Sequence, residues 1–445
     1  MDWIKLWVEH VVYPLMERFT HNRVRACTAA LLATERTGAA QVQLRRLAEH
    51  LNLCARHVPA FRALRDVPVD ADPFGALQTL APLAKAAIRR APEQFRNEEI
   101  PAHALIENRS GGSTGEPLRF FMTRQNVEWY EAARWRGLSW WNITFGSRCL
   151  MVWGAPVELG RMQLARFRLR ERFLKNRVIL SAYGLDVRKA DAYARLLRRF
   201  RPEYLYGYAS ALCALAQILP APMPELRLKA VVSTAETLAP EQRALLARTF
   251  ACPVVNEYGA RDAGILAFEC PCGRMHLTQE NAVLEILDPV THAPVPPGTA
   301  GTVAVTDLTN DAMPRPRYLL GDIAALDPAP CPCGRRLPVL CPPEGREDAL
   351  LQLPDGTLVH GSLVDKLSRR YGSVRQVRLE QNDPGHAELL LVQTMRDAEQ
   401  AQALLREIQA RLPGVQVTLR TVSSIAPEPS GKRLCATRRF PLRRP

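Results

Sequence analysis

The spacing of apolar residues predicts that the first 95 residues are mainly helical. Residues 42–58, VQLRRLAEHLNLCARHV, place apolar side chains every third or fourth position, as one face of a helix requires. The opening stretch, MDWIKLWVEHVVYPLMERF, is amphipathic in the same way. Charged residues interrupt its apolar run, so it matches neither a signal peptide nor a membrane span. We expect a helix packed on its own domain, with attachment to a membrane surface as the alternative.

Beyond the next long helix, expected at residues 124–138, short apolar runs alternate with helical patterns. The predicted strands are residues 149–154, 178–184, 203–208, 228–236 and 253–259, and the predicted helices are residues 191–200, 209–219 and 240–250. Strands that alternate with helices are typical of βαβ units. The sequence therefore predicts an α/β fold with a mostly parallel sheet.

The rhythm changes at residue 282, where AVLEIL, GTVAVTDL and IAALDP are separated by Pro/Gly turns. This pattern favours an antiparallel subdomain. The Pro- and Gly-rich stretch 341–348 is a candidate hinge, and the strand and helix patterns after it predict a small α+β domain. The expected division is therefore residues 1–95, 96–344 and 345–445, with the first two ranges forming one large domain.

Composition narrows the classes of function. Apolar residues make up 47% of the chain and charged residues 23%, which excludes a largely disordered protein. The net charge of +14 favours polyanionic ligands: nucleic acid, phosphorylated cofactors or anionic lipid. Six of the 11 cysteines are dispersed among mostly apolar neighbours, as reduced core residues are. With no secretory signal expected, we predict a cytoplasmic protein.

Four further cysteines lie in two matching strings, Cys270-Pro-Cys-Gly-Arg-Met-His276 and Cys331-Pro-Cys-Gly-Arg335. Thiolates and imidazole are the ligands that Zn²⁺ prefers, and four of them form a closed structural site. The favoured set is Cys270, His276, Cys331 and Cys333, with Cys272 as a competing ligand. Free reduced cysteines and redox chemistry are the alternatives.

Several turns of small residues and several acidic positions along the chain are candidates for ligand binding. The stretch SGGSTGEP at 110–117 can form an anion-binding loop, although its spacing is not that of a P-loop. Glu236, Tyr258 and Asp262 follow apolar strands, where an open parallel sheet binds its ligands. Asp322 lies in a Gly-Asp turn, and Lys432 follows a glycine near the end of the chain. Each alone is also typical of an ordinary turn.

Together these motifs resemble those of the adenylate-forming superfamily, and most closely those of the phenylacetate–CoA ligase family. SGGSTGEP, YGARD, YLLGD, GREDA and SGKR stand in the family's order across residues 110–432. The resemblance implies a large N-terminal adenylate-forming domain with mostly parallel sheets plus an antiparallel subdomain. It also implies that residues 96–344 bind nucleotide and substrate, and that residues 345–445 form a small mobile C-terminal α+β domain carrying the catalytic lysine.

The resemblance further implies roles by position. The ATP phosphates would lie on Ser110, Gly111, Gly112, Ser113, Thr114 and Gly115. The adenine site would comprise Ala235, Glu236, Glu257, Tyr258 and Gly259, and the ribose would be held by Asp322 and Arg346. Asp348 would be the hinge, and Lys432 would bridge the acid and the α-phosphate. Arg261 and Asp262 replace the superfamily's usual threonine and glutamate, and Asp262 would hold Mg²⁺.

The function implied is activation of a small-molecule carboxylic acid by ATP and Mg²⁺ through an acyl-adenylate, followed by transfer to CoA. Transfer to an amine, a hydroxyl or a carrier-protein thiol stays open. Two rivals also stay open: a basic zinc-ribbon nucleic-acid-binding protein and a catalytically dead, partner-binding relative. Under the favoured interpretation Zn²⁺ is structural, nucleic acid is not a partner, and a homodimer is left open.

Overall fold

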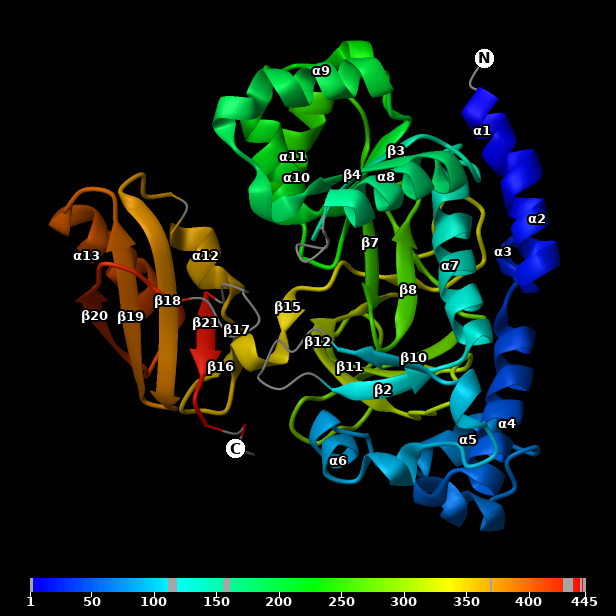
Figure 1. Ribbon diagram of the computed structural model, residues 1–445. Helices are drawn as coiled ribbons and strands as arrows, with labels where there is room; N and C mark the ends of the chain where they lie inside the picture. Colours follow the sequence, from blue (N-terminus) through cyan, green and yellow to red (C-terminus); the bar gives the residue numbers. More distant parts are fainter. Residues whose placement is uncertain are drawn as a thin grey trace.

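The computed structural model describes residues 3–110, 118–154, 161–368, 370–426, 435–440 and 442. Figure 1 shows a large body that contains the N-terminus and a smaller body formed by the C-terminal part of the chain. Among the described residues, no helix has both the length and the apolar character needed to cross a membrane.

A nine-stranded sheet in the order β13-β14-β9-β8-β7-β6-β5-β3-β4 forms the centre of the large body. Strands β4, β3, β5, β6 and β7 are parallel, and the remaining pairs are antiparallel. The parallel part confirms the α/β prediction. The strand bounds are β3 (Cys149–Trp153), β4 (Arg177–Ser181), β5 (Tyr204–Tyr208), β6 (Ala230–Thr234), β7 (Val254–Ala260), β8 (Gly264–Glu269), β9 (Met275–Leu277), β13 (Leu326–Asp327) and β14 (Val339–Leu340).

Helices cover both faces of this sheet. One apolar core joins α9 (Ala190–Phe200), α10 (Ala209–Ile218) and α11 (Pro240–Phe250) to strands β3, β5 and β6. On the other face, Leu138 of α7 (Arg124–Ser139) and Trp140 just beyond it pack on β5, β6 and β7. Helix α8 (Arg161–Lys175) connects β3 to β4, the edge strand. Short 3₁₀ segments complete these connections: η5 (Ala182–Gly184), η6 (Val187–Lys189) and η7 (Pro224–Leu226).

The N-terminal region is helical, as its apolar spacing predicts. It begins with α1 (Trp3–Trp7), the π-helical turn η1 (Val8–Val12) and α2 (Tyr13–Thr20), whose buried residues Ile4, Val8 and Val12 form one small core. Lys5 pairs with Glu203 at 2.9 Å, which ties α1 to the start of β5. The following elements are α3 (Val24–Thr37), α4 (Ala40–His57), η2 (Pro59–Asp66), α5 (Pro73–Gln78), α6 (Lys85–Arg90), η3 (Pro92–Phe95) and η4 (Ala102–Ala104).

A four-stranded antiparallel sheet, in the order β10-β11-β12-β15, lies against α4, η2 and α5 in the largest apolar core. Its strands are β10 (Ala282–Leu287), β11 (Gly301–Asp307), β12 (Tyr318–Ala324) and β15 (Gly345–Arg346). The antiparallel pairing after residue 282 agrees with the sequence prediction. A separate hairpin, β1 (Ile106–Arg109) with β2 (Arg119–Met122), brackets residues 111–117.

The chain leaves the large body after β15. The smaller body contains a four-stranded sheet, β20-β19-β18-β21, the hairpin β16–β17 and two helices around one apolar core. Its elements are η8 (Glu347–Ala349), β16 (Leu350–Gln352), β17 (Leu358–His360), α12 (Ser362–Ser368), β18 (Val374–Asp383), β19 (His386–Gln393), α13 (Ala398–Arg411), β20 (Gln416–Thr421) and β21 (Ala436–Arg438). Its mixture of helix and sheet matches the expected α+β pattern.

Candidate nucleotide site and cysteine cluster

Tyr258 of the nine-stranded sheet meets Asp322 and Arg346 of the four-stranded sheet. Tyr258 at the end of β7 donates its hydroxyl to Asp322 Oδ2 at 2.9 Å, and Arg346 Nη1 donates to Asp322 Oδ1 at 2.8 Å. All three side chains are half-buried. Gly321 has a φ of +75°, and a Cβ there would lie 3.0 Å from Arg346 Nη2. The glycine therefore lets the arginine approach the carboxylate closely.

Asp262 is buried in the turn between β7 and β8. Its Oδ2 accepts from the Tyr318 hydroxyl at 2.7 Å and lies 3.8 Å from Lys85 Nζ. Arg315, which is also buried, donates to the Asp262 carbonyl at 2.8 Å. Sequence reasoning missed these three partners. Tyr318 opens the YLLGD motif and was therefore within reach, but no sequence signal connects Lys85 of α6 with Asp262.

Glu257 of β7 is held inside the protein. Its carboxylate accepts hydrogen bonds from Tyr206 at 2.6 Å, Thr234 at 2.8 Å and Arg134 at 3.3 Å. These donors come from β5, β6 and α7, so the carboxylate joins three elements at the carboxyl ends of the parallel strands. Gly259 nearby has no room for a side chain, because a Cβ would lie 2.5 Å from the Gly264 carbonyl.

Ala235 and Glu236 form the turn after β6. Ala235 has a φ of +63°, a left-handed conformation that a residue other than glycine adopts only under local constraint. Glu236 accepts from the Ser210 amide at 2.7 Å and from the Ser210 hydroxyl at 2.9 Å. Because Ser210 lies in the first turn of α10, these bonds fix the β6 turn beside that helix.

The expected phosphate loop is described only at its first residue. The Ser110 amide donates to the Leu118 carbonyl, and the Leu118 amide donates to Ser110 Oγ, both at 2.8 Å. Arg261 Nη1 donates to the Arg109 carbonyl at 3.3 Å, which places it beside the base of this loop. Gly111, Gly112, Ser113, Thr114, Gly115 and Lys432 lie outside the described residues, as does the side chain of Asp348.

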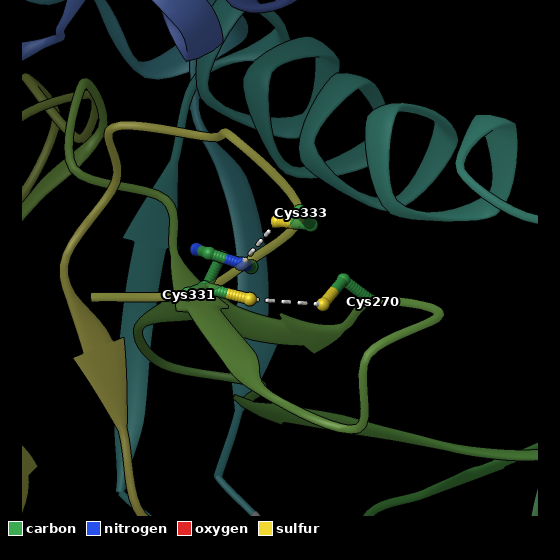
Figure 2. A group of neighbouring side chains, drawn as sticks. Cys270, Cys331 and Cys333 are labelled. Carbon is green, nitrogen blue, oxygen red and sulfur yellow. Dashed lines mark hydrogen bonds between the residues drawn. The ribbon is translucent and has the colours of Figure 1, made fainter. Parts of the chain in front are cut away.

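Cys270, His276, Cys331 and Cys333 come together, with all four possible ligand atoms within 4.8 Å of one another. The Cys270 and Cys331 sulfurs are 3.7 Å apart, and Cys333 Sγ lies 3.2 Å from His276 Nε2 (Figure 2). Cys272 is exposed and does not belong to this group. The structure thus brings together the favoured ligand set.

The two cysteine strings adopt matching turns. The Gly273 amide donates to the Cys270 carbonyl at 2.8 Å, and the Gly334 amide donates to the Cys331 carbonyl at 3.4 Å. Both glycines have positive φ, +73° and +78°. The repeated CPCGR sequence therefore forms the same turn twice. The first cysteines of the two strings, Cys270 and Cys331, point toward each other. The strings lie at the antiparallel edge of the nine-stranded sheet, between β8 and β9 and between β13 and β14.

His276 is oriented for coordination. Its Nδ1 lies 3.2 Å from the Leu337 carbonyl, which only accepts, so Nδ1 carries the proton and Nε2 has a free lone pair facing Cys333. Burial lowers the pKa of His276 and keeps the ring neutral. Three thiols and one neutral imidazole at these separations fit a tetrahedral Zn²⁺ ion.

The chain is similar to known proteins in sequence and in fold. No protein-family profile matches the chain. Over 306 residues it is 27% identical to the phenylacetate–coenzyme A ligase of Thermus thermophilus, covering 66% of this chain and 67% of the relative. It is 24% identical to protein CapK of Staphylococcus aureus over 262 residues, covering 56% of this chain and 54% of CapK. The alignment thus spans about half the length of CapK.

The fold is also found among solved structures. A 2-hydroxyisobutyryl-CoA ligase in the postadenylation state aligns with a TM-score of 0.68 and 18% identity, covering 89% of this chain and 88% of that protein. This similarity extends over both bodies and supports the same architecture. The chain is thus similar in sequence to phenylacetate–CoA ligases and shares the fold of the 2-hydroxyisobutyryl-CoA ligase.

Proposed function

We propose that this protein is an ATP- and Mg²⁺-dependent acid–CoA ligase. In the first step a carboxylate oxygen of the acid attacks the α-phosphorus of ATP, forming acyl-AMP as pyrophosphate leaves. In the second step the CoA thiol attacks the acyl carbon, forming a thioester as AMP leaves and the thiol proton passes to solvent. The observation that carries this proposal is the hydrogen-bonded Tyr258–Asp322–Arg346 group. By the family resemblance, Asp322 and Arg346 would hold the ribose, and Tyr258 would line the adenine site.

Asp322 would accept hydrogen bonds from the two ribose hydroxyls of ATP. Arg346 and Tyr258 already fix its carboxylate from two sides, so little ordering would be needed when nucleotide binds. Adenine would lie along the turns at Ala235–Glu236 and Glu257–Gly259. The Glu257 carboxylate is buried and already accepts hydrogen bonds from three protein donors, so its contribution would be to shape these turns.

Mg²⁺ would bind with ATP near Asp262. One oxygen of this carboxylate is shared by Tyr318 and Lys85, so the ion would compete with Lys85 for it. Mg²⁺ supplies charge neutralisation of the phosphates as pyrophosphate leaves. Arg261, which donates to the Arg109 carbonyl beside the base of the phosphate loop, would add a second cation.

Lys432 would act at the α-phosphate. The attack brings two anions together, and a cation that bridges them stabilises the transition state more than the separate reactants. Transfer to CoA would then require the smaller body to rotate about Asp348 and withdraw Lys432. The short segment after β15, which joins the two bodies, would allow this rotation.

The Cys270–His276–Cys331–Cys333 cluster would hold one structural Zn²⁺ ion. All four ligands come from the protein, which leaves no open position for a substrate. The ion would tie the β8–β9 turn to the segment between β13 and β14. Its contribution is therefore to the stability of the sheet edge.

The test of the proposed reaction is direct analysis of its products. The purified protein is incubated with ATP, Mg²⁺, CoA and a panel of aryl, fatty and amino acids, and mass spectrometry follows acyl-AMP and acyl-CoA. We expect one acid class to produce both, with equal amounts of AMP and thioester. If acyl-AMP accumulates in the presence of CoA but its acyl group is transferred to an added amine or carrier protein, that compound and not CoA is the acceptor. ATP binding without any acyl-AMP would favour the inactive relative.

A further inference from the structure

Part of the first helical segment faces away from the protein. Trp3 is 64% exposed, and Leu6 and Trp7, on the same side of the helix, are also exposed. The opposite side packs inward through Ile4 and Val8. Large apolar side chains on the outer face of an anchored helix are unusual, because folding normally hides them from water.

Helix α8 shows the same feature with added charge. Leu169 is 58% exposed and Phe173, one turn later, is also exposed, so they form an outward apolar stripe. Exposed arginines flank this stripe at 166, 168 and 170. The helix carries six basic residues and one acid, Glu171, which is buried and paired with Arg177.

The two helical segments adjoin. Helix α8 contacts η1, and Asn176 directly after α8 donates to the Gly146 carbonyl at 2.7 Å. Gly146 in turn lies against the Lys5 carbonyl, where a Cβ would come within 2.7 Å. Figure 1 shows α1 and α8 at the same end of the large body. We call this surface the basic–aromatic face and define it by Trp3, Leu6, Trp7, Leu169 and Phe173 with Arg166, Arg168 and Arg170.

Acidic side chains do little to offset this charge. Glu9 lies 3.5 Å from the Thr144 hydroxyl, and Glu17 accepts from the Arg25 amide at 2.9 Å, so both are directed at the protein. Lys5 and Lys229 neutralise Glu203. The face therefore keeps a positive surplus beside exposed tryptophan, leucine and phenylalanine.

We propose that the basic–aromatic face binds the surface of an anionic lipid bilayer. Apolar side chains on short helices insert at the level of the headgroups, where tryptophan is especially favourable, and arginines bind the anionic lipids around them. A phosphate backbone would also satisfy the arginines, but it would leave Leu6, Leu169 and Phe173 without an apolar partner. The lipid surface satisfies both kinds of side chain, and this complementarity favours it over nucleic acid.

The test uses the full-length protein and vesicles of phosphatidylcholine with or without 30% phosphatidylserine. Co-sedimentation at several salt concentrations measures the partition coefficient. We expect binding to the anionic vesicles only, weakening as salt rises. The variants Trp3→Gln/Trp7→Gln and Arg166→Gln/Arg168→Gln/Arg170→Gln should each lower the partition coefficient at least tenfold, from loss of insertion and loss of charge respectively.

Two matched variants serve as controls. Phe74→Gln/Met395→Gln removes exposed apolar residues elsewhere, and Arg375→Gln/Arg406→Gln/Arg411→Gln removes three exposed arginines from the smaller body. Both should bind like the parent chain, and all variants should keep the parent's melting temperature and its acid-activating activity in solution.

The proposal is overturned if anionic vesicles fail to bind the protein, or if the controls weaken binding as much as the face variants. It is also overturned if light scattering shows a dimer that the Trp3/Trp7 variant dissociates, since a second copy would then cover the face. Binding to DNA that needs the arginines but not the tryptophans would instead assign the face to nucleic acid. None of these results bears on the proposed ligase activity, which is measured without vesicles.

Discussion

The cysteine cluster and the Tyr258–Asp322–Arg346 group lie in the same large body but are built in opposite ways. In the cluster, three of the four side chains are buried, and the four ligand atoms lie within 4.8 Å of one another. In the proposed nucleotide group, Tyr258–Asp322–Arg346, all three side chains are half-buried. The Arg346 guanidinium and the Tyr258 hydroxyl hold the Asp322 carboxylate, which keeps partial access to solvent. The first arrangement is closed, as a structural metal site is, and the second is ready for an external ligand.

Because the two sites are built differently, we expect the cysteine cluster to determine stability and the nucleotide group to determine activity. A change in the cluster should act on folding and leave the chemistry of the remaining folded molecules intact. A change in the nucleotide group should act on ATP and leave folding nearly unchanged.

Replacing one cysteine of the cluster should cause the largest loss of stability. For Cys331→Ser we expect loss of bound zinc and of about 5 kcal/mol in the free energy of unfolding, a part of the ~10–16 kcal/mol typical of structural zinc binding. Metal analysis and denaturant unfolding measure the two effects. Cys272→Ser is the matched control, because Cys272 is exposed in the same string, and it should retain one zinc per chain. Zinc loss in Cys272→Ser would reverse the ligand assignment.

Removing the proposed catalytic cation should act on the rate alone. Lys432→Ala should slow acyl-AMP formation by about 10²–10³-fold, the usual effect of losing one preorganised electrostatic contact in a transition state. Acid-dependent exchange of pyrophosphate into ATP measures this step, and thermal unfolding should be unchanged. Lys366→Ala, an exposed lysine of the same body, should behave like the parent. Full exchange activity in Lys432→Ala would remove the lysine from the mechanism.

Weakening the ribose contact should raise the KM for ATP. Asp322→Asn keeps the shape but loses the charge, and a charge-assisted hydrogen bond contributes about 1.5–3 kcal/mol. The expected increase in KM is therefore about 10–100-fold, with a change in unfolding free energy below ~1 kcal/mol. Glu388→Gln breaks an exposed ion pair with Arg420 and should change neither quantity. A large loss of stability in Asp322→Asn would show that the group is structural.

Glu203 lies outside both the cysteine cluster and the Tyr258–Asp322–Arg346 group, and its charge should affect stability alone. Burial alone would raise the pKa of Glu203, but hydrogen bonds from Lys229 and Lys5 lower it to about 2. Because the pKa is lower in the folded protein, the carboxylate stabilises the fold at neutral pH, and this contribution disappears as the pH falls from about 4.5 towards 2. Glu203→Gln should cost about 1.5 kcal/mol at pH 7. The difference from the parent should shrink in that acidic window, and a constant difference across it would contradict the assignment.

Regular periodicity made most of the fold predictable from the sequence. The helix at 124–138 and the strands at 149–154 and 203–208 agree with α7, β3 and β5 to within one residue at each end. Strands β9, β14 and β15 were not predicted, because two or three residues are too few to show a period of two. Their place in the sheets depends on partners distant in sequence, which local patterning does not report.

The candidate site was predictable where a motif fixes its residues. Asp322 and Arg346 stand in separate motifs, and the structure pairs them across β12 and β15. The duplicated CPCGR strings likewise indicated that Cys270 and Cys331 would meet. Lys85 was missed because its contact with Asp262 depends on a long-range pairing, in which Leu83, just before α6, lies beside Tyr318 of β12. The lysine itself resembles any solvated residue of a short helix.

The most direct test of the central claim is pyrophosphate release from ATP and Mg²⁺ over the acid panel, with and without CoA, in the parent chain and in Asp322→Asn. The account predicts release that depends on one class of acid, increases with CoA, and in Asp322→Asn returns to the parent rate when ATP is raised. A parent chain that neither binds ATP nor releases pyrophosphate with any acid would contradict it.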